Sequence, residues 1–169
     1  MQRIGLLSDS HGRAGTTREG VRKLVALEVE ALIHLGDIGT VEVLDALAEE
    51  GTDGQPLPAY LVFGNTDWDS DSLASYADDL DLHVMHPVGR LSTSRGDLAF
   101  LHGHEPDRMQ ALLESDDPPA FLAHGHTHKV SDTRSGSTRV INPGALFRAA
   151  TKTVGVLDVV TDRFDILTV

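Results

Sequence analysis

The chain has 169 residues, 40% of them apolar and 24% charged, which suits a single folded domain spanning residues 1–169 and excludes an intrinsically disordered chain. It has no cysteine, so disulfides and thiolate zinc sites are excluded and any metal needs nitrogen and oxygen ligands. A formal net charge of −12 disfavours extended nucleic-acid binding, and no apolar stretch is long enough to predict a membrane span.

The first half of the chain repeats a strand and helix pattern. Residues 4–8, 31–35 and 59–63 are short apolar runs typical of buried strands. Apolar residues at helical spacing follow each run, through residues 21–29, 41–48 and 70–80. Three such units in succession predict a parallel sheet. Because residues 1–7 lead directly into the first strand without a secretory signal, we expect a cytoplasmic location.

The second half is richer in β-structure. Residues 84–88 and 98–101 predict a hairpin around a turn at residues 94–97, and residues 107–115 predict a short helix after Pro106. Residues 120–123 form another apolar run, and turns at residues 134–137 and 161–162 separate the remaining strands. The pattern predicts an α/β fold of two facing mixed sheets flanked by helices, with the loops at the strands' carboxyl ends converging.

Metal-binding residue types follow five of the predicted strands. Six of the nine histidines lie in these segments, whereas histidines used for packing should be scattered. Carboxylate, amide and imidazole groups together suit manganese, iron, nickel or zinc. The sequence therefore predicts a two-metal hydrolase, and its candidate site residues are Asp9, His11, Asp37, Asn65, His102, His104, His126 and His128.

These segments closely resemble the motifs of the calcineurin-like metallophosphoesterase superfamily, especially its small single-domain phosphodiesterase branch. The patterns Asp-x-His, Gly-Asp, Gly-Asn-x-Asp, His-Gly-His and Gly-His-x-His occur in the family's order, beginning at residues 9, 36, 64, 102 and 125. Asn142-Pro143-Gly144 resembles the family's strand-end turn. The resemblance implies a four-layer α-β-β-α sandwich.

The resemblance also implies how two divalent ions are held, with manganese expected first and nickel, iron or zinc as alternatives. It assigns Asp9, His11, Asp37 and His128 to the first metal, and Asp37, Asn65, His102 and His126 to the second. A bridging hydroxide would then attack phosphorus in line. Asp37 and Asn65 are expected to take part in catalysis, and His104 is the candidate to protonate the leaving group.

The sequence departs from part of the superfamily at two places. Thr66 follows Asn65, where many monoesterases and protein phosphatases have histidine, and Ile38 follows Asp37 in place of the arginine of the protein phosphatase branch. Both differences favour a phosphodiesterase acting on small or nucleotide-like phosphodiesters. The alternatives are a phosphomonoesterase or nucleoside polyphosphate hydrolase, and a non-catalytic interaction scaffold such as the retromer subunit that shares this fold.

Several polar residues have two interpretations. His124 is interpreted as a core or supporting residue rather than a ligand. Asp67 either caps the next helix or supports a ligand. Arg13 either binds substrate phosphate or is a solvated loop charge. Surface or packing roles are expected for the remaining histidines, which are His34, His83 and His86.

The sequence leaves the oligomeric state open, and a homo-oligomer, dimeric or tetrameric, is possible.

Overall fold

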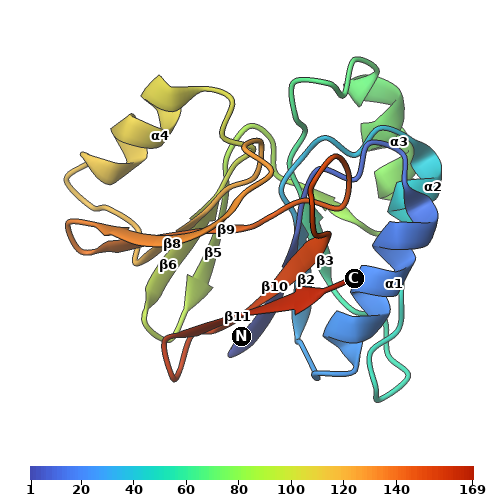
Figure 1. Ribbon diagram of the computed structural model, residues 1–169, viewed down its shortest axis with the longest axis horizontal. Helices are drawn as coiled ribbons and strands as arrows, with labels where there is room; N and C mark the ends of the chain where they lie inside the picture. The colour runs from blue at the N-terminus through green and yellow to red at the C-terminus, as the bar shows by residue number, and fades with distance from the viewer.

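The computed structural model describes residues 1–169 and contains two β-sheets that face each other (Figure 1). In the first sheet β1, β2, β3 and β4 run parallel, and β10 and β11 continue it in antiparallel fashion. The first half of the chain therefore forms the predicted parallel sheet. Its strands, in the order β11-β10-β1-β2-β3-β4, are Arg163–Thr168, Thr153–Asp158, Arg3–Leu7, Ala31–His34, Ala59–Leu61 and His83–Val84.

The second sheet has five strands, of which β6, β7 and β9 are parallel to one another. The outer strands β5 and β8 pair with it in antiparallel fashion. Both sheets are thus mixed. The strands, in the order β5-β6-β7-β9-β8, are Gly89–Thr93, Gly96–Phe100, Phe121–Ala123, Thr138–Pro143 and Val130–Ser135.

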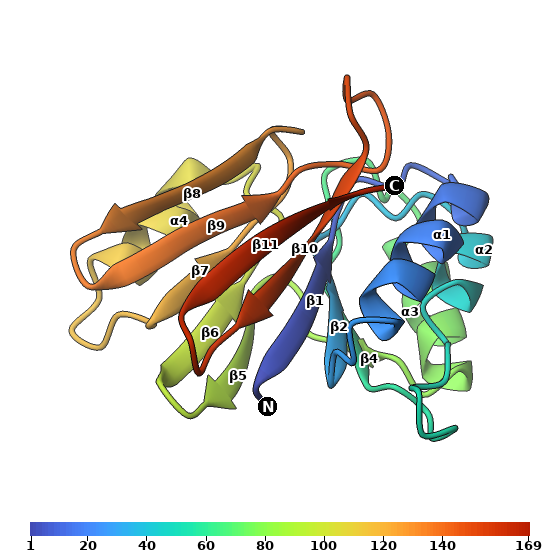
Figure 2. The same cartoon turned by 60° about the horizontal axis from the view of Figure 1, so that its bottom comes forward.

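Helices cover the outer faces of both sheets (Figures 1 and 2). Helices α1 (Ala14–Val25), α2 (Val41–Asp45) and α3 (Ser70–Asp79) lie on the first sheet, and α4 (Pro106–Leu113) lies on the second. None of these helices is both long and apolar enough to cross a bilayer.

The alternation of side chains along the strands divides the interior into three cores. Leu6 on β1 and Phe100 on β6 lie in the core between the sheets, whereas Leu7 packs in the core beneath α1, α2 and α3. Ala99 and Leu101 face the opposite way and pack with α4. Three cores separate four layers, so the expected α-β-β-α sandwich is confirmed.

The predicted hairpin begins later in the chain than expected. Val84 belongs to β4, where it pairs with Leu61 of the first sheet, so residues 84–88 do not form a hairpin strand. Pro87 has no amide hydrogen for a ladder, and the partner of β6 starts only at Gly89. A Cβ atom at Gly89 would overlap the ring of Phe100, which explains glycine at this entry point. A turn does join the two strands, but it is shorter than predicted, since β5 ends at Thr93 and β6 begins at Gly96.

Candidate metal centre

The carboxyl ends of the parallel strands in both sheets meet at one edge, and five of the predicted ligands converge there. Asp9 Oδ1 lies 3.2 Å from Nε2 of His128, and His11 completes one group of possible ligands. Asp37 Oδ2 lies 3.4 Å from Nε2 of His11 and 3.5 Å from Nε2 of His102. Asp9, Asp37 and His102 form a second group. Two carboxylates therefore link three imidazoles.

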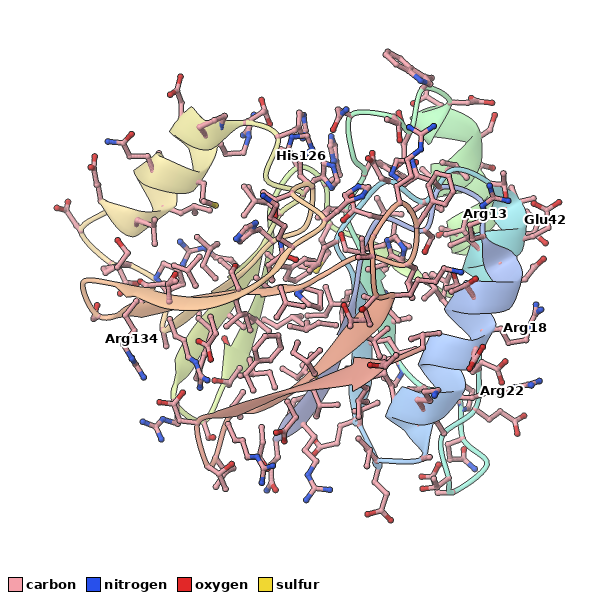
Figure 3. All side chains as sticks on the ribbon, in the orientation of Figure 1. Arg13, Arg18, Arg22, Glu42, His126 and Arg134 are labelled. Carbon is pink, nitrogen blue, oxygen red and sulfur yellow. The ribbon has the colours of Figure 1, made fainter.

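The remaining predicted site residues lie around this centre. Asn65 Oδ1 is 3.1 Å from Nε2 of His102. The ring of His126 is centred 5.1 Å from that of His102, but its nitrogens belong to neither group, and its side chain is exposed at the site edge (Figure 3). The ring of His104 is centred 5.4 Å from that of His102. The family resemblance assigned Asp9 to one metal alone, whereas the geometry also groups it with Asp37 and His102.

Two of the converging atoms are buried without a hydrogen-bond partner. These are Asp9 Oδ1 and His11 Nε2, whose contacts with neighbouring site residues do not have hydrogen-bond geometry. A buried polar atom left unpaired costs free energy, so a partner for both is required. Oxygen and imidazole nitrogen donors at such a point fit a divalent cation.

A backbone hydrogen bond orients His102 so that one of its ring nitrogens faces the centre. Its Nδ1 lies 2.8 Å from the carbonyl oxygen of Leu35, which can only accept, so Nδ1 carries the proton. Nε2 is thereby directed at Asp37 and Asn65. Binding one imidazole nitrogen to a backbone carbonyl is the usual way of fixing the other as a metal ligand.

Five of the site residues have left-handed backbone conformations. The φ angles of Asp9, His11, Asp37, His126 and His128 lie between 44° and 66°. For a residue with a side chain this conformation costs about 1–2 kcal/mol. Such outliers cluster at functional sites, where surrounding structure imposes them.

Asp67 is the main support for two of the site loops. Its carboxylate accepts hydrogen bonds from the amides of Ile38, Gly39 and Gly64, at 3.2, 2.8 and 2.8 Å. It therefore joins the loop of Asp37 to the loop of Asn65. The N-cap of α3 is Asp69, so the supporting role for Asp67, rather than the capping role, agrees with the structure.

Close approach, rather than a left-handed turn, explains the glycine at position 64. A Cβ atom there would overlap the carboxylate of Asp37. The amide of Thr66 also donates to Asp37 Oδ1 at 2.9 Å. Asp37 is therefore fixed from two sides before any ligand binds.

Asn142 supports the histidine loop on the second sheet, a role that its position in the strand-end motif did not reveal. Its side-chain amide donates to the carbonyl of Gly125 at 2.9 Å and to Thr127 at 3.1 Å, and its oxygen accepts from the amide of Gly144 at 2.9 Å. His124 is buried beside it, 3.4 Å from the same amide nitrogen. This position agrees with a supporting role for His124.

Charges at the centre are strongly coupled. Burial raises the pKa of Asp9. Burial also acts to raise the pKa of Asp37, but hydrogen bonds from His102 and the Thr66 amide outweigh it and hold that pKa well below its usual range. For His102 burial acts to lower the pKa, and the opposing effect of Asp37 leaves it raised. Asp37 is thus ionised at neutral pH.

The family model described as the calcineurin-like phosphoesterase superfamily domain matches residues 2–162. The chain belongs to this superfamily. The family is metal-dependent, and the clustered aspartates and histidines agree with that dependence. The chain is accordingly a phosphoesterase.

Individual relatives extend the comparison. A phosphodiesterase of Methanocaldococcus jannaschii is 26% identical over 161 residues, which cover 92% of each chain. The solved structure of an archaeal phosphodiesterase has a TM-score of 0.85 at 20% identity and covers 99% of both chains. Vps29 of Chaetomium thermophilum has a TM-score of 0.67 at 16% identity, covering 100% of this chain and 93% of its own. The last two show a shared fold.

A buried histidine outside the motifs orders the first loop of the phosphoesterase. His34 lies 2.8 Å from Oγ of Ser10 through Nε2, and its Nδ1 accepts from the amide of Gly36 at 3.2 Å. Nε2 therefore carries the proton and donates to Ser10, which stands between Asp9 and His11. His34 is fully buried, which agrees with the expected packing role. The apolar run at residues 31–35 was the only sign of this burial in the sequence.

We predict that His34 makes the metal-free protein less stable in acid. Burial lowers the pKa of His34 to about 3, so between pH 6.5 and about 3 only the unfolded chain binds this proton. The free energy of unfolding should fall with decreasing pH across that window, by up to about 1.4 kcal/mol per pH unit from this residue. Urea titrations of wild type and His34→Gln with chelator present measure the difference. Parallel pH profiles would contradict the prediction.

Proposed function

We propose that this phosphoesterase is a two-metal phosphodiesterase that hydrolyses small or nucleotide-like phosphodiesters. The observation that carries the proposal is the position of Asp37, whose Oδ2 lies between Nε2 of His11 and Nε2 of His102. A carboxylate placed in this way suits bridging of two cations. The related phosphodiesterase of M. jannaschii and the threonine at position 66 support a diester substrate.

The proposed ligand sets follow the motifs. Asp9, His11, Asp37 and His128 would hold one ion, and Asp37, Asn65, His102 and His126 the other. When bound, two divalent ions supply an activated water nucleophile and neutralise charge on the phosphoryl oxygens. Manganese is the first ion to test, followed by nickel, iron and zinc.

The chain's own residues contribute orientation and proton transfer. The neutral amide of Asn65 supplies an oxygen without adding negative charge beside two carboxylates. His104 lies close enough to the centre to act on a leaving group, and its Nδ1 is buried without a hydrogen-bond partner. We therefore assign it as the proton donor.

We predict that Asp37→Ala abolishes hydrolysis of bis(p-nitrophenyl) phosphate. Loss of the bridging carboxylate should lower metal affinity and kcat/KM by at least about 100-fold. The assay uses protein stripped with chelator, with manganese, nickel, zinc or magnesium restored separately. Asp78→Ala, an exposed carboxylate on α3, is the matched control. Normal activity of metal-replete Asp37→Ala would contradict the two-metal proposal.

The same assay separates the enzyme from the scaffold alternative suggested by the fold of Vps29. Metal-restored activity of the wild type supports the phosphodiesterase. Complete inactivity with two ions bound per chain, measured by elemental analysis, would favour an interaction module.

The role of His104 predicts a dependence on the leaving group. A general acid contributes about 10²–10⁴-fold when the leaving group is basic. His104→Gln should therefore slow a phenyl phosphodiester, with a leaving-group pKa near that of tyrosine, much more than the p-nitrophenyl ester. Steady-state kcat values for a series of aryl esters measure the slope. Equal losses along the series would exclude proton donation by His104.

Position 66 is predicted to set the preference between diester and monoester. Thr66 Oγ1 lies 3.4 Å from Nδ1 of His11, so a side chain here borders the centre. Threonine cannot protonate an alkoxide at neutral pH, whereas histidine can. Thr66→His should raise monoester turnover relative to diester turnover by about 10-fold or more. An unchanged ratio of phenyl phosphate to diphenyl phosphate hydrolysis, with a leaving group basic enough to need protonation, would exclude this role.

A further inference from the structure

Phe147 lies at the side of the centre formed by His11 and His128. Its ring is centred 5.4 Å from that of His11, which in turn is centred 5.5 Å from that of His128. The loop between β9 and β10 that carries Phe147 is anchored by a hydrogen bond from the amide of Leu146 to the carbonyl of Ser8, at 3.1 Å. Phe147 is therefore fixed against the proposed ligands of one ion.

Two guanidinium groups pack on this ring. The Arg13 guanidinium carbon lies 4.6 Å from the ring centroid, and that of Arg148 lies 5.2 Å from it. The two come from different elements, the start of α1 and the loop between β9 and β10. Stacking on an aromatic face holds a guanidinium in place and leaves its N–H edge available for hydrogen bonds.

Neither guanidinium is neutralised by the protein, although acidic residues outnumber basic ones by 26 to 14. Arg13 and Arg148 are exposed and form no salt bridge or side-chain hydrogen bond. Most other arginines do have carboxylate partners, and these are Arg3, Arg90, Arg108, Arg134, Arg139 and Arg163. The stacked pair beside the centre thus supplies free cationic donors in an acidic protein.

Arg18 and Arg22 also lack carboxylate partners, but they lie further along α1. Figure 3 shows Arg13 at the end of the helix nearest the site edge and Arg18 and Arg22 on its more distant turns. Only Arg13 among these three stacks on an aromatic ring next to His11. The position of Arg13, rather than its charge alone, is what distinguishes it.

A planar guanidinium matches the oxygens of a phosphate group bidentately. The proposed centre would bind the reacting phosphodiester, and Arg13, stacked on Phe147 beside it, is free to bind a different anion of the same substrate. We infer that Arg13, positioned by Phe147 and assisted by Arg148, binds a second phosphate carried by one ester substituent. This inference rests on the proposed phosphodiesterase function and makes the preferred substrate a phosphodiester with an additional phosphate, such as a nucleotide diester bearing a terminal phosphate.

Two chromogenic substrates with the same leaving group test the inference. Both are p-nitrophenyl esters of thymidine 5′-phosphate, and one of them carries a further phosphate on the 3′ oxygen. The measured quantity is the ratio of kcat/KM for the substrate with the second phosphate to that for the substrate without it, in manganese-loaded protein. Wild type should prefer the substrate with the second phosphate.

Arg13→Ala should lower this ratio about 10- to 100-fold, which is the range for loss of a hydrogen-bonded charge contact. Arg13→Lys should lower it less, since the charge remains without the planar fork. Phe147→Leu should also lower it, because Arg13 loses its support. Arg18→Ala, which removes an equal charge five residues further along the chain, is the matched control and should leave the ratio unchanged. Thermal melting of each variant checks that folding is intact.

The outcomes separate this inference from the function on which it rests. Wild type that hydrolyses both esters without preference, or an Arg13→Ala ratio equal to that of Arg18→Ala, overturns the second-phosphate site and leaves the phosphodiesterase standing. Wild type inactive on both esters with every metal overturns both. A lowered kcat/KM ratio in Arg13→Ala and Phe147→Leu, with the ratio of Arg18→Ala unchanged, supports Arg13 as the second-phosphate site.

Discussion

The packing of one sheet against the other is the constraint on which the site depends. Leu6 and Ile33 from the first sheet share a core with Phe100 and Phe121 from the second. This contact aligns the carboxyl ends of β1, β2 and β3 with those of β6, β7 and β9. Asp37 then meets His102, although the two are 65 positions apart in sequence. Neither sheet alone supplies all the residues of either group of possible metal ligands.

The site lowers the stability of the folded chain, and packing in the apolar cores must offset this cost in free energy. Five residues with left-handed backbone conformations and a buried pair of carboxylates are all unfavourable in isolation. Hydrogen bonds on both sides of the site offset part of this cost. Asp67 joins the Asp37 and Asn65 loops through three hydrogen bonds, and Asn142 holds the histidine loop through two. The loops are thereby held in conformations that local sequence preferences would not select.

The sequence allowed the strands, helices and site residues to be predicted where local rules are sufficient. Asp9, Asp37 and Asn65 each follow an apolar run, and parallel strands bring such positions together whatever the details of packing. The prediction of the first hairpin strand at residues 84–88 was wrong. Val84 pairs with β3 of the first sheet, and no local sequence pattern encodes this pairing. The hydrogen bonds of His34 and Asn142 and the contact of Phe147 with His11 were not predicted for a related reason, since their partners are distant in sequence.

The parallel strands also leave the opposite edge of the molecule without site residues. The turn at residues 159–162 follows Asp158, which pairs with Arg3 at the amino end of β1. Residues 51–58 lead into the amino end of β3, so they also lie at the edge opposite the site. Chain inserted at either place would project away from the metal ligands. These turns are therefore suitable positions for an affinity tag, a fluorophore or a surface linkage in an active enzyme.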